Sequence, residues 1–300
     1  MTTTSVVGTR RRARRTAVAW LFLAPFMLVF LLYTAVPTVA ALGFSLTDLR
    51  GPDLRHPLAV DFTGLDNFVR LLKDETFLRD ILNTALFVAV GVPLTMGIGF
   101  SLALALNSGI RRLRGTFRTL FFAPVVTNVV AVAFIWQYAF NPNGTVNKVL
   151  GAVGLAGPNW LDDPNLAMPV VILLGVWRNF GIAMVLFLAG LQAIPQDVYE
   201  AASLDGAGRW RQLRHITLPL LLPTTLLVSV LLTVFYLQVF EEPYLLTDGG
   251  PLGSTESMAL YTYHQFGAGE FGMSSAASFV TLVLVALVSL VQFRLLRPRA

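Results

Sequence analysis

The sequence predicts an all-α membrane protein with six transmembrane helices, and three observations support this fold class. The mean hydropathy is +0.67 and only 13% of the residues are charged, which is too apolar for a soluble globular domain. The apolar residues gather in blocks, and six blocks reach the roughly 20 residues that a helix needs to cross a bilayer. Basic residues concentrate in alternate loops between these blocks.

The six predicted spans differ in how clearly the sequence marks them. They cover residues 17–43, 81–106, 119–140, 168–192, 216–240 and 275–293. The first is free of charged residues from Thr16 to Thr47, and the fifth from His215 to Phe240 if histidine is neutral. The fourth contains one charged residue, Arg178. The third is the shortest and the most polar, so its ends are the least sharply marked.

The loops divide into two groups by charge, and this division orients the spans. One group comprises the N-terminal arm 1–16 (net +5), loop 107–118 (+4), loop 193–215 (zero) and the tail 294–300 (+3). The other comprises loops 44–80 (net −2), 141–167 (−1) and 241–274 (−5). Because Lys and Arg concentrate on the cytoplasmic side of membranes, both termini are predicted to be cytoplasmic. The pI near 9.9 is then a sign of topology, and no nucleic-acid partner is expected.

No motif of a catalytic or metal site is present in the sequence. It has no P-loop, no His-Glu-x-x-His and no Gly-x-Ser-x-Gly, and it has no cysteine for a thiolate site. The three histidines, His56, His215 and His264, lie in three different predicted loops. We therefore expect no enzymatic activity, no metal and no cofactor bound by this chain.

A polar segment of unusual length separates the fourth and fifth predicted spans. Pro195 suits the first turn of a helix, which we expect over 196–204. Asp205 and Gly206 interrupt this helix, since Asp is a favoured N-cap and Gly accepts unusual backbone angles. A second helix is expected from 209 to 216.

Two interpretations of this helix–turn–helix segment remain open on physical grounds. Its exposed acid, small residues and large apolar side chains suit a groove on another protein. Alternatively, it is an amphipathic connector whose Trp210 lies among lipid headgroups.

The stretch "EAASLDGAGRWRQLRHITLP" resembles the EAA loop of permease subunits of binding-protein-dependent ABC importers. That pattern is Glu-Ala-Ala, three residues, Gly, nine residues, and Ile-x-Leu-Pro. The matching residues are Glu200, Ala201, Ala202, Gly206, Ile216, Leu218 and Pro219. The resemblance extends over most of the chain, including "FRTLFFAPVV" and "FEEPYLLTDGGP", and narrows to sugar permeases of the maltose and glycerol-phosphate type. The N-terminal "WLFLAPFMLVFLLYTAVPTV" is similar to the first of the two permeases in such systems.

The resemblance implies a complete transport machine. It implies the type I ABC importer permease (MetI-like) fold in a six-helix domain over 17–293, in a bacterial cytoplasmic membrane. The implied partners are a second six-span permease in a heterodimer, a pair of ABC ATPases that bind ATP, an external sugar-binding protein and the lipid bilayer. The implied function is ATP-driven import of a sugar or oligosaccharide. The alternatives are a stand-alone secondary transporter, for which the spans lack ion-coupling acids, and a membrane scaffold.

The resemblance also assigns residues to ATPase coupling within the cytoplasmic loop 195–215. They are Glu200, Ala201, Ala202, Asp205, Gly206, Trp210 and Leu213. Glu200 would make a charged contact with the ATPase and Gly206 would form the bend. Ala202, Trp210 and Leu213 would supply apolar docking contacts.

Polar side chains at the depth of the spans are the candidates for a substrate pathway. Arg178 is the strongest feature, because a charge inside a span normally faces protein or water. It either lines the translocation cavity, binding hydroxyls or an acid such as Glu241 or Glu242, or it lies in the outer half of its span, where it snorkels or joins two helices. The second alternative is favoured over direct sugar contact. The other candidates are Asn179, Gln137, Tyr236 and Gln238, each more often an interhelical hydrogen-bonding group.

A stripe of small residues, Gly97, Ser101 and Ala105, recurs every four positions in the second predicted span. Such stripes allow helices to approach closely, so we expect this one to pack against another helix of the same chain rather than to form a ligand site.

Overall fold

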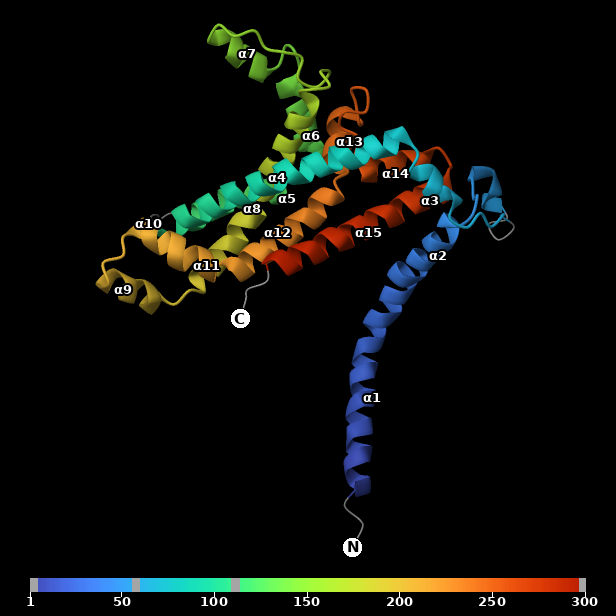
Figure 1. Cartoon of the computed structure of the whole chain (residues 1–300), viewed down its shortest axis with the longest axis horizontal. Coiled ribbons are helices and arrows are strands. Elements are labelled where there is room, and N and C mark those ends of the chain that lie inside the picture. Colours follow the sequence, from blue (N-terminus) through green and yellow to red (C-terminus); the bar gives the residue numbers. More distant parts are fainter. Residues whose placement is uncertain (1–4, 56–59, 109–113, 297–300) are drawn as a thin grey trace.

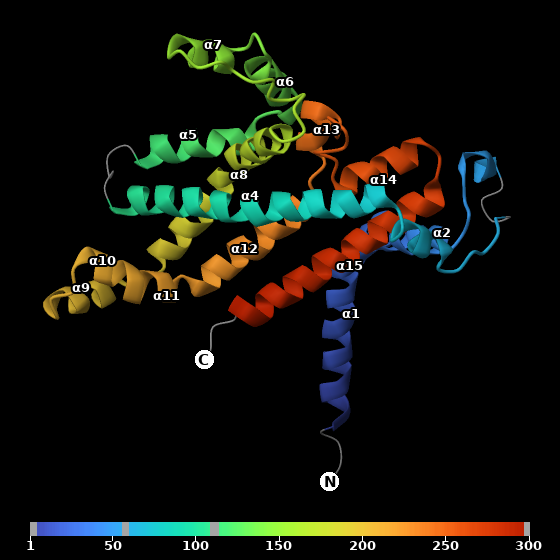
Figure 2. The ribbon, with the colours of Figure 1, turned by 45° about the horizontal axis from the view of Figure 1, so that its top comes forward.

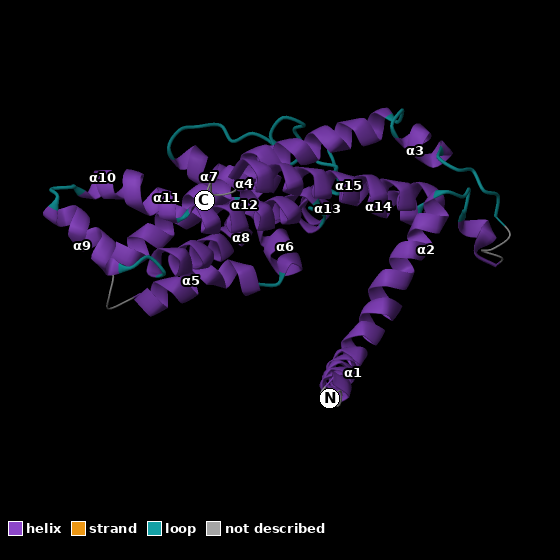
Figure 3. Ribbon diagram, turned by 60° about the horizontal axis from the view of Figure 1, so that its bottom comes forward, coloured by secondary structure: helices purple, strands orange, loops and turns teal. Residues whose placement is uncertain are grey.

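The computed structural model describes residues 5–55, 60–108 and 114–296, and over these ranges it consists of helices and loops (Figure 3). The N-terminal half contains α1 (Ser5–Phe30), the π-helical η1 (Leu31–Ala35), α2 (Val36–Ser45), η2 (Gly51–Arg55), α3 (Asp66–Leu71), α4 (Glu75–Ser108), α5 (Arg114–Val126), α6 (Val129–Phe140) and α7 (Thr145–Ala152). The C-terminal half contains α8 (Ala167–Gln192), α9 (Gln196–Leu204), α10 (Arg209–Gln212), η3 (Leu213–Thr217), α11 (Leu218–Leu220), α12 (Leu222–Leu237), α13 (Glu241–Thr247), α14 (Met258–Gly267) and α15 (Phe271–Leu296).

Four of the described helices are long and apolar enough to cross a membrane. They are Val18–Ser45, Glu75–Asn107, Ala167–Gln192 and Phe271–Leu295. Two bent helix pairs, Arg114–Val126 with Val129–Ala152 and Arg209–Leu220 with Leu222–Leu237, bring the number to six if each pair is one span. Residues 1–4 of the predicted N-terminal arm, 297–300 of the predicted tail, and Arg111 and Arg112 lie outside the described residues.

The third predicted span differs from the single helix expected over 119–140. The chain breaks at Thr127 and Asn128, and the two helices on either side meet at 91°. Asn128 is extended and its side chain accepts hydrogen bonds from the backbone N–H groups of Val130 and Ala131, so it caps a new helix. Pro124, one turn earlier, also lacks the amide hydrogen that a continuous helix would use.

Helix α8 lies at the centre of the bundle. It packs most extensively on α4 and also contacts α5, α12 and α13, while α15 packs on α12, α14 and α2 (Figure 2). The most apolar stretch of α8 is 56% buried, against 11% for α15 and none for Val18–Ser45. The outer helices thus present apolar side chains outward, as expected in lipid. Helix α1 stands apart from the bundle (Figure 1).

Glycines allow α8 and its neighbours to approach closely. A Cβ atom at Gly99 of α4 would lie 2.8 Å from the backbone nitrogen of Met184 in α8 and would also meet the Cβ of Ala183. A Cβ at Gly175 of α8 would lie 2.8 Å from the ring of Phe87. Any larger residue at these positions would force the helices apart.

The small-residue stripe Gly97–Ser101–Ala105 does not pack against the described part of the chain, contrary to expectation. A Cβ atom at Gly97 would meet nothing within 4 Å, and Ser101 and Ala105 are exposed. The helix turns a different set of small residues, including Gly91 and Gly99, toward its partners. Residue size alone does not reveal which of two faces points inward.

The two glycines of α4 provide a matched test of this packing. We expect Gly99→Val to lower the free energy of unfolding by about 1–3 kcal/mol, as overpacked cores do, because α8 blocks the added side chain. Gly97→Val introduces the same residue into the same helix and should have little effect. The measurement is equilibrium unfolding in mixed detergent, and equal losses for the two variants would contradict the packing described.

Candidate functional site

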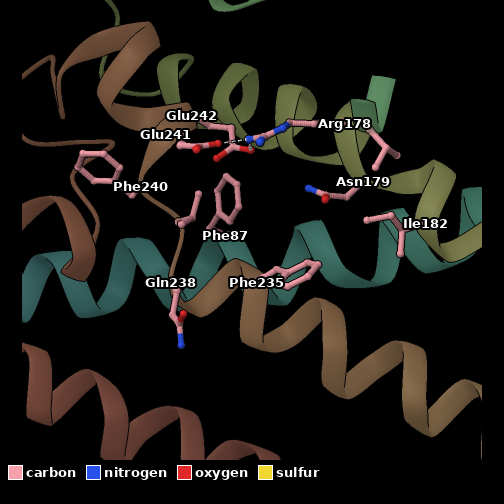
Figure 4. Close-up of a pocket in the computed structure, with 11 residues that line it drawn as sticks. Phe87, Arg178, Asn179, Ile182, Phe235, Gln238, Phe240, Glu241 and Glu242 are labelled. Atoms are coloured by element: carbon pink, nitrogen blue, oxygen red, sulfur yellow. Dashed lines mark hydrogen bonds and ion pairs between the residues drawn. The ribbon is translucent and has the colours of Figure 1, made fainter. Parts of the chain in front are cut away.

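The first candidate site is a polar pocket beside α8. It has a volume of about 440 Å³ and lies between α4, α5, α8, the end of α12 and the start of α13. Its lining residues are Phe87, Val125, Arg178, Asn179, Ile182, Phe235, Gln238, Val239, Phe240, Glu241 and Glu242 (Figure 4). The lining combines polar groups with aromatic and aliphatic ones, as small-molecule sites usually do.

An ion cluster at one end of the pocket joins α8 to α13. The Arg178 guanidinium donates from Nη1 to Glu242 Oε1 at 3.0 Å and also contacts the Glu241 carboxylate (Figure 4). The Glu242 side chain is only 8% exposed and that of Glu241 is 48% exposed. Burial raises the pKa of the Glu242 carboxyl above its ordinary value, and the Arg178 guanidinium opposes this rise.

Helix α13 is short because two local features begin and end it. It starts at Glu241, and its first turn carries both acids, where a negative charge favours the helix N-terminus. It ends at Asp248, whose φ of 50° turns the chain away. The pair of acids is therefore presented to Arg178 by a helix only seven residues long.

The structure brings three of the five pathway candidates to this pocket. Arg178 lines the pocket and also joins α8 to α13 through Glu241 and Glu242. Asn179 lines the pocket while its Nδ2 donates to the Gly175 carbonyl one turn earlier. Gln238 is the C-cap residue of α12 and also lines the pocket, with its side chain directed away from Arg178 (Figure 4).

The other two candidates form hydrogen bonds between helices. The Tyr236 hydroxyl is buried and lies 2.6 Å from Thr95 Oγ1, which joins α12 to α4. The Gln137 side chain donates to the carbonyls of Leu245 (2.7 Å) and Leu246 (3.2 Å), which joins α6 to α13. Gln137 also lines a second cavity of about 490 Å³ between α6, the loop before α8 and the end of α13.

Several apolar lining residues were not identified from the sequence. Phe87, Ile182 and Phe235 border the pocket from three different helices. Nothing in the sequence distinguishes a phenylalanine that lines a cavity from the many that fill a core or face lipid.

The second candidate site is the bent segment between α8 and α12, at the opposite end of the bundle from α3 (Figure 1). The predicted helix–turn–helix is confirmed: α9 ends at Leu204 and α10 begins at Arg209. Gly206 has a φ of +75°, a left-handed conformation that glycine adopts without strain. Asp205 is the C-cap of α9 rather than an N-cap, and Gly208 takes the N-cap position of α10.

The bent segment presents a mixed surface to its surroundings. Glu200, Ala201, Asp205 and Gly206 are exposed, while Ala202 and Leu213 are half-buried. Trp210 is 73% exposed and Leu204, which was not among the predicted residues, is 90% exposed. Exposed large apolar side chains beside an acid are typical of a protein-binding surface. A leucine at the last position of a short helix carries no such signal in the sequence alone.

Comparisons with known proteins identify the family. Residues 95–300 match the family described as "Binding-protein-dependent transport system inner membrane component". The chain belongs to this family. It is 35% identical over 287 residues to the lactose transport system permease protein LacF of Rhizobium radiobacter, covering 93% of this chain and 94% of LacF. It is 34% identical to the trehalose/maltose transport system permease protein MalF of Thermococcus litoralis, covering 95% and 96%.

A solved structure also resembles the chain closely. A crystal structure of a bacterial ABC transporter involved in the import of alginate, an acidic polysaccharide, contains a chain that superposes with a TM-score of 0.81 and 25% identity. The match covers 96% of this chain and 98% of that chain. The predicted ABC importer permease fold is therefore confirmed. The chain is a multi-pass permease of an ABC importer, which excludes the stand-alone secondary transporter and the scaffold.

The ion cluster gives a test that combines mutation with pH. We expect Arg178→Met to lower the free energy of unfolding by about 3 kcal/mol at neutral pH, because Glu242 is then a buried carboxylate without its partner. A second change, Glu242→Gln, should restore most of this loss. The measurement is equilibrium unfolding in mixed detergent.

The pH dependence of the Arg178→Met variant follows from the pKa of Glu242. This pKa is raised in the folded chain, so protonation favours the folded state as the pH falls through it. The difference between native chain and variant should therefore shrink at low pH. A difference that is equally large at pH 5 and pH 8 would contradict this assignment.

Proposed function

We propose that this permease imports a sugar or oligosaccharide, and that the bent segment 195–215 transmits the motion of an ATPase to the spans. The relatives named for lactose and for trehalose and maltose support the substrate class. The observation that carries the coupling role is the bend itself. A short helix ends at a left-handed Gly206 and exposes Glu200, Leu204 and Trp210, in a segment that matches the EAA pattern.

The proposed assembly has four kinds of component around the bilayer. A second six-span permease forms a heterodimer with this chain, and a pair of ABC ATPases binds the bent segments on the cytoplasmic side. ATP binds to the ATPases and no cofactor binds to this chain. An external sugar-binding protein delivers the substrate. Both termini are cytoplasmic, as the distribution of arginine supports, and the membrane is the bacterial cytoplasmic membrane.

In the proposed mechanism, closure of the ATPases moves α9 and the spans follow. The ATPase has a different affinity for the inward-facing and outward-facing states, so ATP binding shifts the population between them. Helix α9 follows α8 after three residues, so a displacement of α9 acts directly on the central helix.

The pocket is the proposed section of the sugar pathway in this chain. Asn179 and Gln238 supply polar groups for hydroxyls, and Phe235 and Phe240 supply apolar surface for a sugar ring. Arg178 is already paired with two acids, so its role is to hold α13 against α8 rather than to bind the sugar. Tyr236 and Gln137 support the arrangement through their interhelical hydrogen bonds.

Purification of the chain from membranes tests the proposal. The expected result is co-isolation of an ABC ATPase and a second six-span permease. In proteoliposomes with an external binding protein, the complex should take up at least one of lactose, maltose and trehalose only when ATP is supplied. Sugar flux through the chain alone, or isolation without any ATPase, would contradict the proposal.

The bend at Gly206 provides a sharper test. We expect Gly206→Val to abolish ATP-driven uptake while the complex still assembles, because a β-branched side chain is strained at a φ of +75° and changes the direction of α9. The measurements are uptake, ATP hydrolysis and subunit recovery after purification.

Gly208→Val is the matched control for this experiment. Gly208 has a φ of −68° and a ψ of 163°, a conformation that valine readily adopts, and an added Cβ meets nothing within 4 Å. Its uptake should stay close to native. Equal uptake by the two variants would show that ATP-driven transport does not depend on the left-handed conformation at Gly206.

A further inference from the structure

The bent segment has two arms, α9 before the turn and α10 with η3 after it. Hydrogen bonds of side chains join these two arms. The Gln212 side-chain amide on α10 donates from Nε2 to Ser203 Oγ at 2.9 Å and to the Ala207 carbonyl at 3.0 Å. The Ser203 hydroxyl in turn donates to the Tyr199 carbonyl at 2.8 Å. Closer to α12, the Tyr199 hydroxyl lies 3.0 Å from Thr217 Oγ1. The arms are thus joined at two levels.

The bend itself offers little resistance to a change of angle. Added Cβ atoms at Gly206 and Gly208 would meet nothing within 4 Å, so no side chain packs against the turn at these positions. Two backbone hydrogen bonds close the turn, from Gly206 N to the Ser203 carbonyl (3.1 Å) and from Ala207 N to the Ala202 carbonyl (2.9 Å). Both involve the end of α9 only, so neither holds α10. Glycine-rich backbone without packing is a natural hinge.

The contact between Tyr199 and Thr217 connects the bent segment to the packed core of the protein. Thr217 is buried and stands at the end of η3, immediately before α11 and α12. Tyr199 packs against the main hydrophobic core. Force on α9 therefore reaches α12 through Tyr199 and Thr217, and Gln212 is the side chain that holds α9 to α10 next to the turn.

We propose that Gln212 is a positioning residue, which locks α9 to α10 so that displacement of α9 moves the fifth span instead of flexing the turn. This inference rests on the proposed coupling function of the segment. Gln212 is half-buried and both hydrogens of its amide are directed to partners within the loop. In this proposal Gln212 does not touch the ATPase. It affects the contact between α9 and the ATPase by fixing the direction of α9.

The first experiment measures the angle between the arms in the purified transporter complex. The chain has no cysteine, so spin labels can be placed at Asp197→Cys on α9 and Arg214→Cys on η3, both exposed. The distance distribution should be narrow with Gln212 and clearly broader with Gln212→Leu, which keeps the size and removes the donors. Gln212→Arg keeps donors for both acceptors and should restore the narrow distribution, whereas Gln212→Glu should not.

The second experiment measures coupling in the same complexes. The quantity is the number of lactose, maltose or trehalose molecules taken up per ATP hydrolysed in proteoliposomes. Loss of two hydrogen bonds should lower this ratio about fivefold in Gln212→Leu while ATP hydrolysis continues. Gln265→Leu, a change of the same type on α14 at the other end of the bundle, is the control and should leave the ratio unchanged.

The outcomes separate this inference from the proposed function. An unchanged ratio and an unchanged distance distribution in Gln212→Leu would overturn the role of Gln212 while the native complex still couples uptake to ATP. A native chain that binds no ATPase would overturn both. If Gln212→Leu fails to assemble, Ser203→Ala removes one of the two acceptors, and a distribution as narrow as native would then overturn the inference.

Discussion

The close approach of α8 to its neighbours is the constraint on which the other features depend. Glycine at positions 99 and 175 lets the backbones and rings of α4 and α8 meet where any side chain would separate them. With this contact, α8 is the most enclosed of the four long apolar helices. The same helix carries Arg178 and Asn179 near its middle, at the pocket, and leads into α9 at its C-terminal end. An α-helix rises about 21 Å from Arg178 to Gln192, so the packed helix α8 connects the two candidate sites.

The pocket shows how a charge can be kept within a membrane domain. Arg178 faces two carboxyl groups, of which Glu242 is almost fully enclosed. A buried pair of this kind contributes little net stability, but removal of one partner leaves an uncompensated charge. The pairing therefore fixes α13 in one place beside α8. It also occupies the arginine, while Asn179 and Gln238 add neutral polar groups to the lining of the pocket.

The sequence predicted well those features that depend on local chemistry. Helix α8 was expected over 168–192 and runs from Ala167 to Gln192, because a long apolar run has only one solution in lipid. The turn at Gly206 was expected because glycine is the residue that accepts its backbone angles.

Features that depend on packing partners were harder to predict. The inward face of α4 is set by neighbours distant in the sequence. The interhelical hydrogen bonds expected of Tyr236 and Gln137 are present, but the sequence did not indicate their partners. The exposure of Leu204 and the two bonds of Gln212 likewise appear only when α9 and α10 are folded against each other.

Crosslinking from single cysteines tests the central claim most directly, because the native chain has none. Leu204 on the bent segment and Leu252 in the loop after α13 are matched, being 90% and 85% exposed. With a short thiol crosslinker in native membranes, Leu204→Cys should capture the ATPase in a yield that changes when ATP binds. Leu252→Cys should capture no ATPase. Capture of the ATPase by Leu252→Cys, or by neither variant, would contradict the account of α9 as the part of this permease that the ATPase moves.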